Sequence, residues 1–135
     1  MANVLVLANE TIGGGELLDA IRERHKAGDA RFFVVVPQSK PRHGNVIYDE
    51  AVRDSAQVRV DLALAFMREE DIEGAGEVGD ADPFNAALDA IRHYGIDEII
   101  ISTLPTRVSR WLRVDLPHKV AGLGLPVTTI TARSR

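Results

Sequence analysis

The chain has 135 residues, of which 45% are hydrophobic and 27% charged, and its formal net charge at pH 7 is −4. This length predicts one domain over residues 1–135, and the composition excludes a disordered or collagen-like chain. Because the sequence has no cysteine, disulfides, iron–sulfur clusters, thiolate zinc sites and cysteine nucleophiles are excluded. The acidic balance argues against nucleic acid or an anionic membrane as a partner.

The N-terminal segment has no targeting pattern. Met1–Asn3 contains no basic residue, and the apolar run Val4–Ala8 is too short for a signal peptide or a membrane span. We therefore expect a cytoplasmic protein, which agrees with the lack of cysteine.

The first part of the chain reads as strand, helix, strand. Val4–Ala8 and Phe32–Val36 are continuous apolar runs, typical of strands buried on both faces of a sheet. The helix between them has one face made of Leu17, Leu18, Ile21 and His25. Such a unit is typical of parallel sheets.

After a loop at 37–45, the spacing of apolar residues predicts a long helix over roughly 46–71. Its apolar stripe is expected to consist of Ile47, Ala51, Val58, Leu62, Ala65 and Phe66. Residues 75–78 follow as a candidate for a weak edge strand, since the glycines around them disfavour a strand.

The second half continues the alternation. Asp82-Pro83 predicts a helix start, with Asp as N-cap and Pro in the first turn. Ile99–Ile101 is the next buried strand, and 106–122 reads as an irregular loop followed by a short helix from about Asp115. Val127–Thr131 alternates in polarity, which indicates an edge strand. The order predicts a parallel α/β sheet with helices on both faces.

In such a sheet, ligands bind beyond the carboxyl ends of the strands. Three groups of residues follow predicted strands there: the glycines at 13–15, Ser102-Thr103, and the arginines at 107, 110 and 113. Each has two interpretations. The glycines form an anion contact or only a turn, the hydroxyls bind a ligand or cap the turn, and the arginines hold phosphate or form a solvated face. No pair of histidines has the spacing of a helical metal site, so we expect no metal.

The C-terminal third resembles the universal stress protein (UspA-like) family. The likeness lies in Asp97–Thr103, Ser109–Leu112, Val120 and Gly124–Thr128, with Asp82-Pro83 before the third helix. The resemblance implies a three-layer, Rossmann-like fold of about five strands in the order 3-2-1-4-5, and a stress-response role. It also implies ATP or another adenine nucleotide as ligand. The candidate nucleotide-binding residues are Ala8, Asn9, Gly13, Gly14, Val36, Ser102, Thr103, Arg107, Ser109 and Arg110.

The chain departs from the phosphate-binding loop of that family, which has the form G-x-x-G-x(9)-G-S/T. Ser102 and Pro105 stand at the first two glycines, and Asp115 stands near the third. Asp115 would place a carboxylate where the family holds phosphates. Asn9 replaces the usual Asp after the first strand. These departures predict weak or absent ATP binding.

We therefore expect a regulatory or binding domain rather than an enzyme, because no catalytic set stands out. The alternatives are a nucleotide-binding or nucleotide-hydrolysing protein with a rebuilt phosphate site, and a small enzyme acting on a phosphorylated metabolite. The exposed last strand and the resemblance both imply a homodimer. Its candidate interface residues are Trp111, Leu123, Val127, Thr128, Thr129, Ile130 and Thr131.

Overall fold

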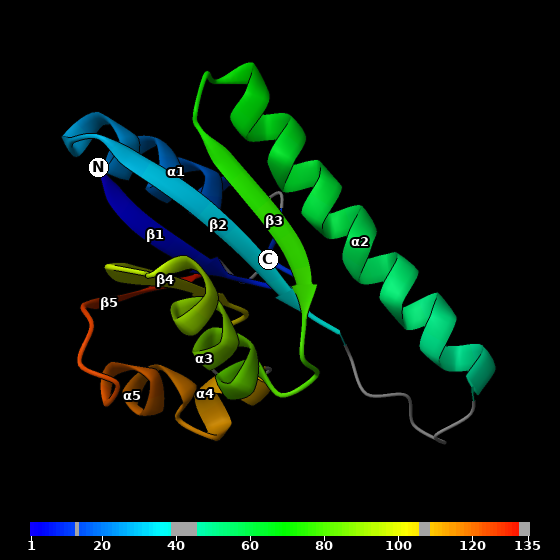
Figure 1. The fold of residues 1–135 in the computed structure, drawn as a ribbon. Coiled ribbons are helices and arrows are strands. Elements are labelled where there is room, and N and C mark those ends of the chain that lie inside the picture. The colour runs from blue at the N-terminus through cyan, green and yellow to red at the C-terminus, as the bar shows by residue number, and fades with distance from the viewer. Residues whose placement is uncertain (13, 39–45, 106–108, 133–135) are drawn as a thin grey trace.

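Parallel strands form a sheet in the order β3-β2-β1-β4-β5, which confirms the expected fold class and strand order (Figure 1). The computed structural model describes residues 1–12, 14–38, 46–105 and 109–132, without the side chains of residues 46–54 and Arg113. The strands are β1 (Ala2–Leu7), β2 (Ala30–Pro37), β3 (Gly74–Gly79), β4 (Glu98–Thr103) and β5 (Val127–Thr131). The helices are α1 (Gly15–Ala27), α2 (Val46–Glu69), α3 (Pro83–Tyr94), α4 (Arg110–Arg113) and α5 (Leu116–Ala121).

The central strand β1 is buried on both faces. Each residue of Val4–Ala8 has 0% of its surface exposed. Val4 and Val6 pack with α1 and α2 on one face, whereas Leu5 and Leu7 pack with α3 and α5 on the other. Val4–Ala8 is apolar at every position because β1 lies between two hydrophobic cores, one on each face of the sheet.

The helix α2 turns a different face to the sheet from the one predicted. It buries Ala56, Val60, Ala63 and Met67, while Val58 and Leu62 are 66% and 52% exposed. The predicted stripe was therefore wrong at these positions and at Ala65, which is also exposed. Ile47 and Ala51 lie outside the described side chains. Two series of apolar residues fit the helical period, and periodicity alone does not distinguish them.

The glycines of β3 explain which series of α2 is buried. A Cβ atom on Gly74 would lie 2.5 Å from Met67 Cε, and one on Gly76 would lie 2.8 Å from Val60 Cγ1. The helix thus packs directly on the strand backbone, and the residues of the buried series occupy the space that side chains on β3 would fill. The candidate strand at 75–78 is confirmed for this reason, as the edge strand Gly74–Gly79.

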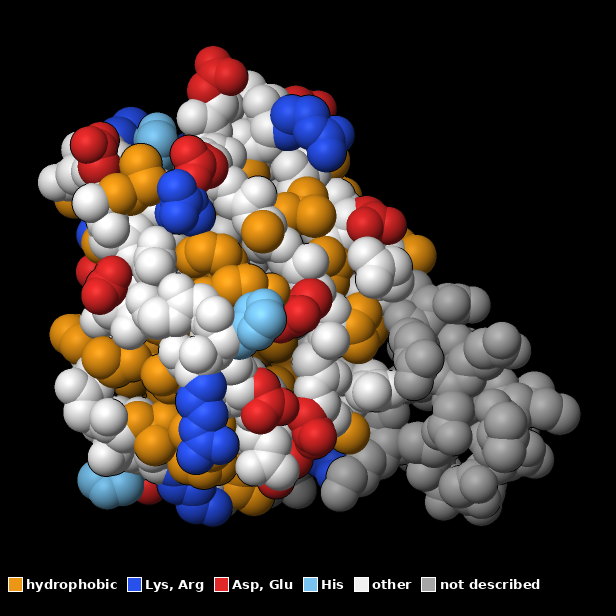
Figure 2. All heavy atoms as spheres, in the orientation of Figure 1, with side chains coloured by type: hydrophobic (Ala, Val, Ile, Leu, Met, Phe, Trp, Pro, Cys, Tyr) orange, Lys and Arg blue, Asp and Glu red, His pale blue; other side chains and the backbone are white. Residues whose placement is uncertain are grey.

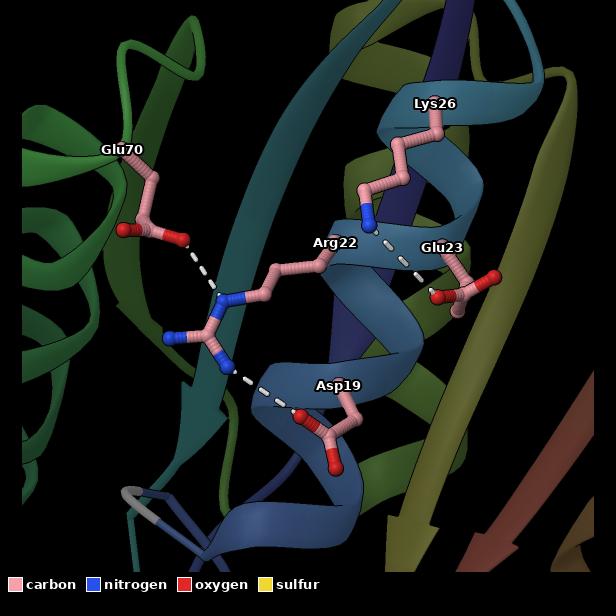
Figure 3. Close-up of polar contacts among 5 residues, drawn as sticks. All are labelled: Asp19, Arg22, Glu23, Lys26 and Glu70. Atoms are coloured by element: carbon pink, nitrogen blue, oxygen red, sulfur yellow. Dashed lines mark hydrogen bonds and ion pairs between the residues drawn. The ribbon is translucent and has the colours of Figure 1, made fainter.

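The side chain of Arg22 connects α1 with the end of α2 on one face of the sheet (Figure 3). Arg22 Nε donates to Glu70 Oε1 at 2.6 Å, and Nη1 donates to Asp19 Oδ1 at 3.1 Å. The hydrogen bond to Glu70 raises the pKa of Arg22. The guanidinium also lies 5.0 Å from the centre of the Phe66 ring. Because these groups are exposed, the ion pairs contribute little to the stability of the fold.

The helix α3 begins and ends as its sequence predicts. Asp82 Oδ1 accepts the N–H of Phe84 at 2.9 Å, with Pro83 in the first turn. Gly95 ends the helix with a φ of 65°, and its N–H donates to Ile91 O at 3.1 Å. This start places the first turn of α3 at the carboxyl edge of the sheet, next to the site described below.

Tyr94 is expected to ionise at a higher pH than an exposed tyrosine. Its ring stacks on Phe33 with centroids 4.4 Å apart. Burial raises the pKa of Tyr94, and the charge and hydrogen bond of Glu77 raise it further. Because the folded-state pKa is raised, the resulting stability is present below about pH 10 and is lost as the pH rises through the folded-state value. Glu77→Gln should lower the pKa of Tyr94 in an absorbance titration, with Tyr94→Phe assigning the transition. An unchanged pKa in Glu77→Gln would contradict the contribution of Glu77.

Candidate ligand-binding cleft

A cleft of about 800 Å³ lies at the carboxyl edge of the sheet, where parallel sheets bind ligands. Its size is in the range of small-molecule sites. Residues that follow β1, β2 and β4 form its floor, and the first turn of α3 together with α4 and α5 forms one wall. Figure 1 shows where these helices and strands lie in the fold. The lining residues are Asn9, Glu10, Thr11, Pro37, Gln38, Ala81, Asp82, Pro83, Phe84, Ser102, Thr103, Leu104, Ser109, Arg110, Trp111, Val114, Leu116 and Lys119.

Hydroxyl groups occupy the floor where β4 ends. The hydroxyls of Thr11 and Ser102 lie 2.6 Å apart and both residues are buried, so each of these oxygens has a hydrogen-bond partner within the protein. Thr103 is 2% exposed, and its Oγ1 has no hydrogen-bond partner in the described part of the chain. An unpaired buried hydroxyl is costly, so Thr103 Oγ1 is a polar atom of the floor whose hydrogen bond the described residues do not supply.

The side chain of Asn9 closes the part of the cleft between β1 and β2. Its Oδ1 accepts a hydrogen bond from Arg59 Nη1 of α2, and its Nδ2 donates to Pro37 O at 3.4 Å. Both ends of the amide are therefore engaged by the protein. Asn9 is a candidate from its place after β1, whereas Arg59 has no signal in the sequence, because it lies 50 residues away in the middle of a long helix.

The wall formed by residues 109–115 offers few free amides to an anion. Four N–H groups in this segment donate within the protein. These bonds run from Ser109 N to Pro105 O (2.9 Å), Leu112 N to Ser109 Oγ (3.1 Å), Val114 N to Arg110 O (3.2 Å) and Asp115 N to Leu112 O (3.2 Å). Pro105 has no N–H to donate. These four amides are therefore not free to bind an anion.

The charges that line the cleft are mixed. Arg110 and Lys119 bring positive charge from α4 and α5, and negative charge comes from Glu10 after β1 and from Asp82 at the start of α3. Asp115, expected to oppose phosphate, is the exposed N-cap of α5 with a φ of 55° and does not line the cleft. The face of the molecule in Figure 2 also shows acidic and basic side chains interspersed.

The structure brings five of the candidate nucleotide-binding residues together in the cleft: Asn9, Ser102, Thr103, Ser109 and Arg110. Ala8 and Val36 are completely buried in the core and do not line it. Gly14 is the N-cap of α1, also outside the lining. Gly13 and Arg107 lie outside the described residues.

Other lining residues were missed or given another role. Trp111, assigned above to a dimer interface, lines the cleft. Lys119 was recognised only as part of a basic segment, although it lies one turn into α5 and reaches the same wall as Arg110. Gln38 follows β2 directly and Thr11 lies four residues after β1, so the rule that ligands bind at strand ends was sufficient to find them.

Within the ranges that the structure describes, no group of three or more His, Asp or Glu residues is arranged to hold a metal ion. In the same ranges, no helix is both long and apolar enough to cross a membrane.

The comparisons with known proteins identify the fold. No family model matches the chain, and no curated protein matches it. Among solved structures, a universal stress protein from Archaeoglobus fulgidus has a TM-score of 0.69 at 16% identity, over 96% of this chain and 93% of that one. A protein from the universal stress protein family of Burkholderia pseudomallei has a TM-score of 0.67 at 18% identity, over 96% of this chain and 95% of that one.

A third similar structure is a universal stress protein family protein from Arabidopsis thaliana with AMP bound. It has a TM-score of 0.63 at 12% identity, over 99% of this chain and 94% of that one. At these identities the likeness concerns the fold. The chain has the universal stress protein fold, and the resemblance seen in the sequence is confirmed at that level.

Proposed function

We propose that this chain is a ligand-binding regulatory domain whose cleft takes an adenine nucleotide with few phosphates and binds ATP weakly or not at all. The observation that carries the proposal is the cleft at the carboxyl edge of the sheet, with a buried hydroxyl floor and two cations on one wall. The AMP-bound Arabidopsis protein of the same fold supports the choice of ligand class. The similarity to universal stress proteins concerns the fold, so the proposed function is argued from the residues of the cleft.

Weak ATP binding follows from the wall at 109–115. Loops that bind polyphosphates use free backbone N–H groups, whereas four amides of this segment are engaged within the protein. Arg110 and Lys119 offer two positive charges, and Glu10 and Asp82 offset them. The positive charge of Arg110 and Lys119 can balance the charge of a single phosphate, but it cannot balance the larger negative charge of a triphosphate.

Titration calorimetry with AMP and with Mg-ATP tests this proposal. We expect AMP to bind and Mg-ATP to bind at least about tenfold more weakly. Arg110→Gln and Lys119→Gln should each weaken AMP binding, whereas Arg68→Gln, an exposed change outside the cleft lining, should not. Mg-ATP binding at about 1 μM or tighter, near −8 kcal/mol, would overturn the proposal.

The proposed role is not enzymatic. No histidine is among the described residues that line the cleft, so a hydrolytic reaction there would have to use a carboxylate, Glu10 or Asp82, as its general base. Release of phosphate from Mg-ATP or from a panel of phosphoesters, lost in Arg110→Gln, would instead favour the hydrolytic alternatives.

We also propose that the protein is a cytoplasmic homodimer that pairs through β5. This strand is an edge of the sheet, and all five of its residues are uncharged and β-branched: the strand reads Val-Thr-Thr-Ile-Thr. An uncharged, open edge favours pairing with a second copy.

A further inference from the structure

The unpaired hydroxyl of Thr103 belongs to one half of the cleft. Side chains alternate along a strand, so Thr103 shares the sheet face of Ile101, which packs with α3 and α5, and Ser102 lies on the opposite face with Thr11. Two aromatic side chains that line the cleft, Phe84 and Trp111, pack against the same core cluster as Ile101. The α3–α4 half of the cleft, defined by Phe84, Thr103 and Trp111, is therefore aromatic with one unsatisfied polar group.

The half of the cleft between β1 and β2 is different. There the amide of Asn9 already has partners at both ends, Arg59 and the carbonyl of Pro37. A ligand that bound to Asn9 would have to replace one of these bonds, whereas a ligand that reached Thr103 would add a bond where none exists. A polar atom of a ligand therefore gains more hydrogen bonding in the α3–α4 half than beside Asn9.

We propose that the planar ring of the ligand lies in the α3–α4 half, against Trp111, with a ring-edge or sugar polar atom bound to Thr103 Oγ1. The ligand class is a heteroaromatic compound with one anionic group, and the anion faces Arg110 and Lys119 on the neighbouring wall. Aromatic side chains provide stacking surfaces for bases without strict selectivity, so the ring position depends on Trp111 and its orientation on Thr103. This inference rests on the proposed function and specifies where its ligand lies.

Trp111 is the only tryptophan in the chain, so its fluorescence reports directly on this half of the cleft. We expect AMP to change the emission of Trp111 with the same Kd that calorimetry gives, and adenosine to produce the same change at higher concentration. Trp111→Leu should weaken AMP binding about fivefold or more, and Trp111→Phe, which keeps a ring, should retain most of the affinity. Calorimetric binding of AMP without any change in emission would overturn the ring position and leave the proposed function intact.

Thr103 provides a second, independent test. Thr103→Val keeps the side-chain shape and removes the unpaired hydroxyl, so the protein without ligand should be as stable as the wild type or more stable. The same variant should bind AMP about fivefold to tenfold more weakly, and Thr103→Ser should restore the affinity. A merely structural hydroxyl would instead give lower stability and unchanged affinity, and that result would overturn the inference. Absence of AMP binding to the wild type would overturn both this inference and the proposed function.

Discussion

Gly76→Ala is expected to destabilise the protein by about 1–3 kcal/mol, and Gly76→Val by more. The added Cβ would lie 2.8 Å from Val60 Cγ1 and 3.1 Å from Val34 O, so α2 must move away from β3. On an ordinary edge strand the same changes would improve strand propensity and stabilise the fold. The predicted sign therefore depends on the close packing of α2 against the strand.

Urea unfolding measures this effect, with Gly15→Ala as the matched control. A Cβ on Gly15 meets nothing within 4 Å at the start of α1, so the control should be neutral or stabilising by up to about 1 kcal/mol. A free energy of unfolding for Gly76→Ala equal to that of the wild type would show that α2 does not pack on β3 as described.

Thr129→Pro is expected to dissociate the proposed dimer while leaving the subunit folded. On β5, Pro126 O accepts the N–H of Ile99, and the N–H of Ala132 donates to Thr103 O. Backbone groups alternate between the two edges of a strand, so even-numbered residues face β4 and the N–H of Thr129 faces outward. Proline at 129 thus removes a donor from the open edge without breaking the pairing with β4.

In a two-fold dimer the substitution removes this donor from both copies, which should cost about 2 kcal/mol, or roughly thirtyfold in the dimer Kd. Sedimentation at micromolar concentration measures it, and Thr129→Ala, which keeps the N–H, should remain dimeric. A wild-type protein that sediments as a 14.8 kDa monomer would refute the proposed dimer. A dimer that is unaffected in a folded Thr129→Pro variant would refute pairing through β5.

Much of the fold could be predicted from local sequence. The composition of Val4–Ala8 indicates a buried strand, and that of Val127–Thr131 indicates an edge strand. Asp82-Pro83 marks a helix start that the structure confirms. The short helix α4 was expected to be irregular loop, because four residues are too few for a periodic pattern. The Ser109 side chain that caps it was the available signal.

The face of α2 and the shape of the cleft could not be predicted in this way, because both depend on contacts between distant segments. Burial of Val60 rather than Leu62 depends on a glycine 16 residues further along the chain. The same is true of the pair formed by Thr11 and Ser102, which are 91 residues apart. Strand ends locate the cleft, but only the packed structure shows which hydroxyl is paired and which is not.

The central position of β1 has a consequence for synthesis on the ribosome. Val4 of β1 pairs with Glu98 of β4, so the strand translated early lacks one neighbour until more than 90 further residues have been added. Until then, β1 and β2 can form only part of the sheet, with an apolar open edge of the kind that associates with other chains. We therefore expect nascent chains that end before β4 to require chaperone protection, and the complete sheet to form only after β4 has left the exit tunnel.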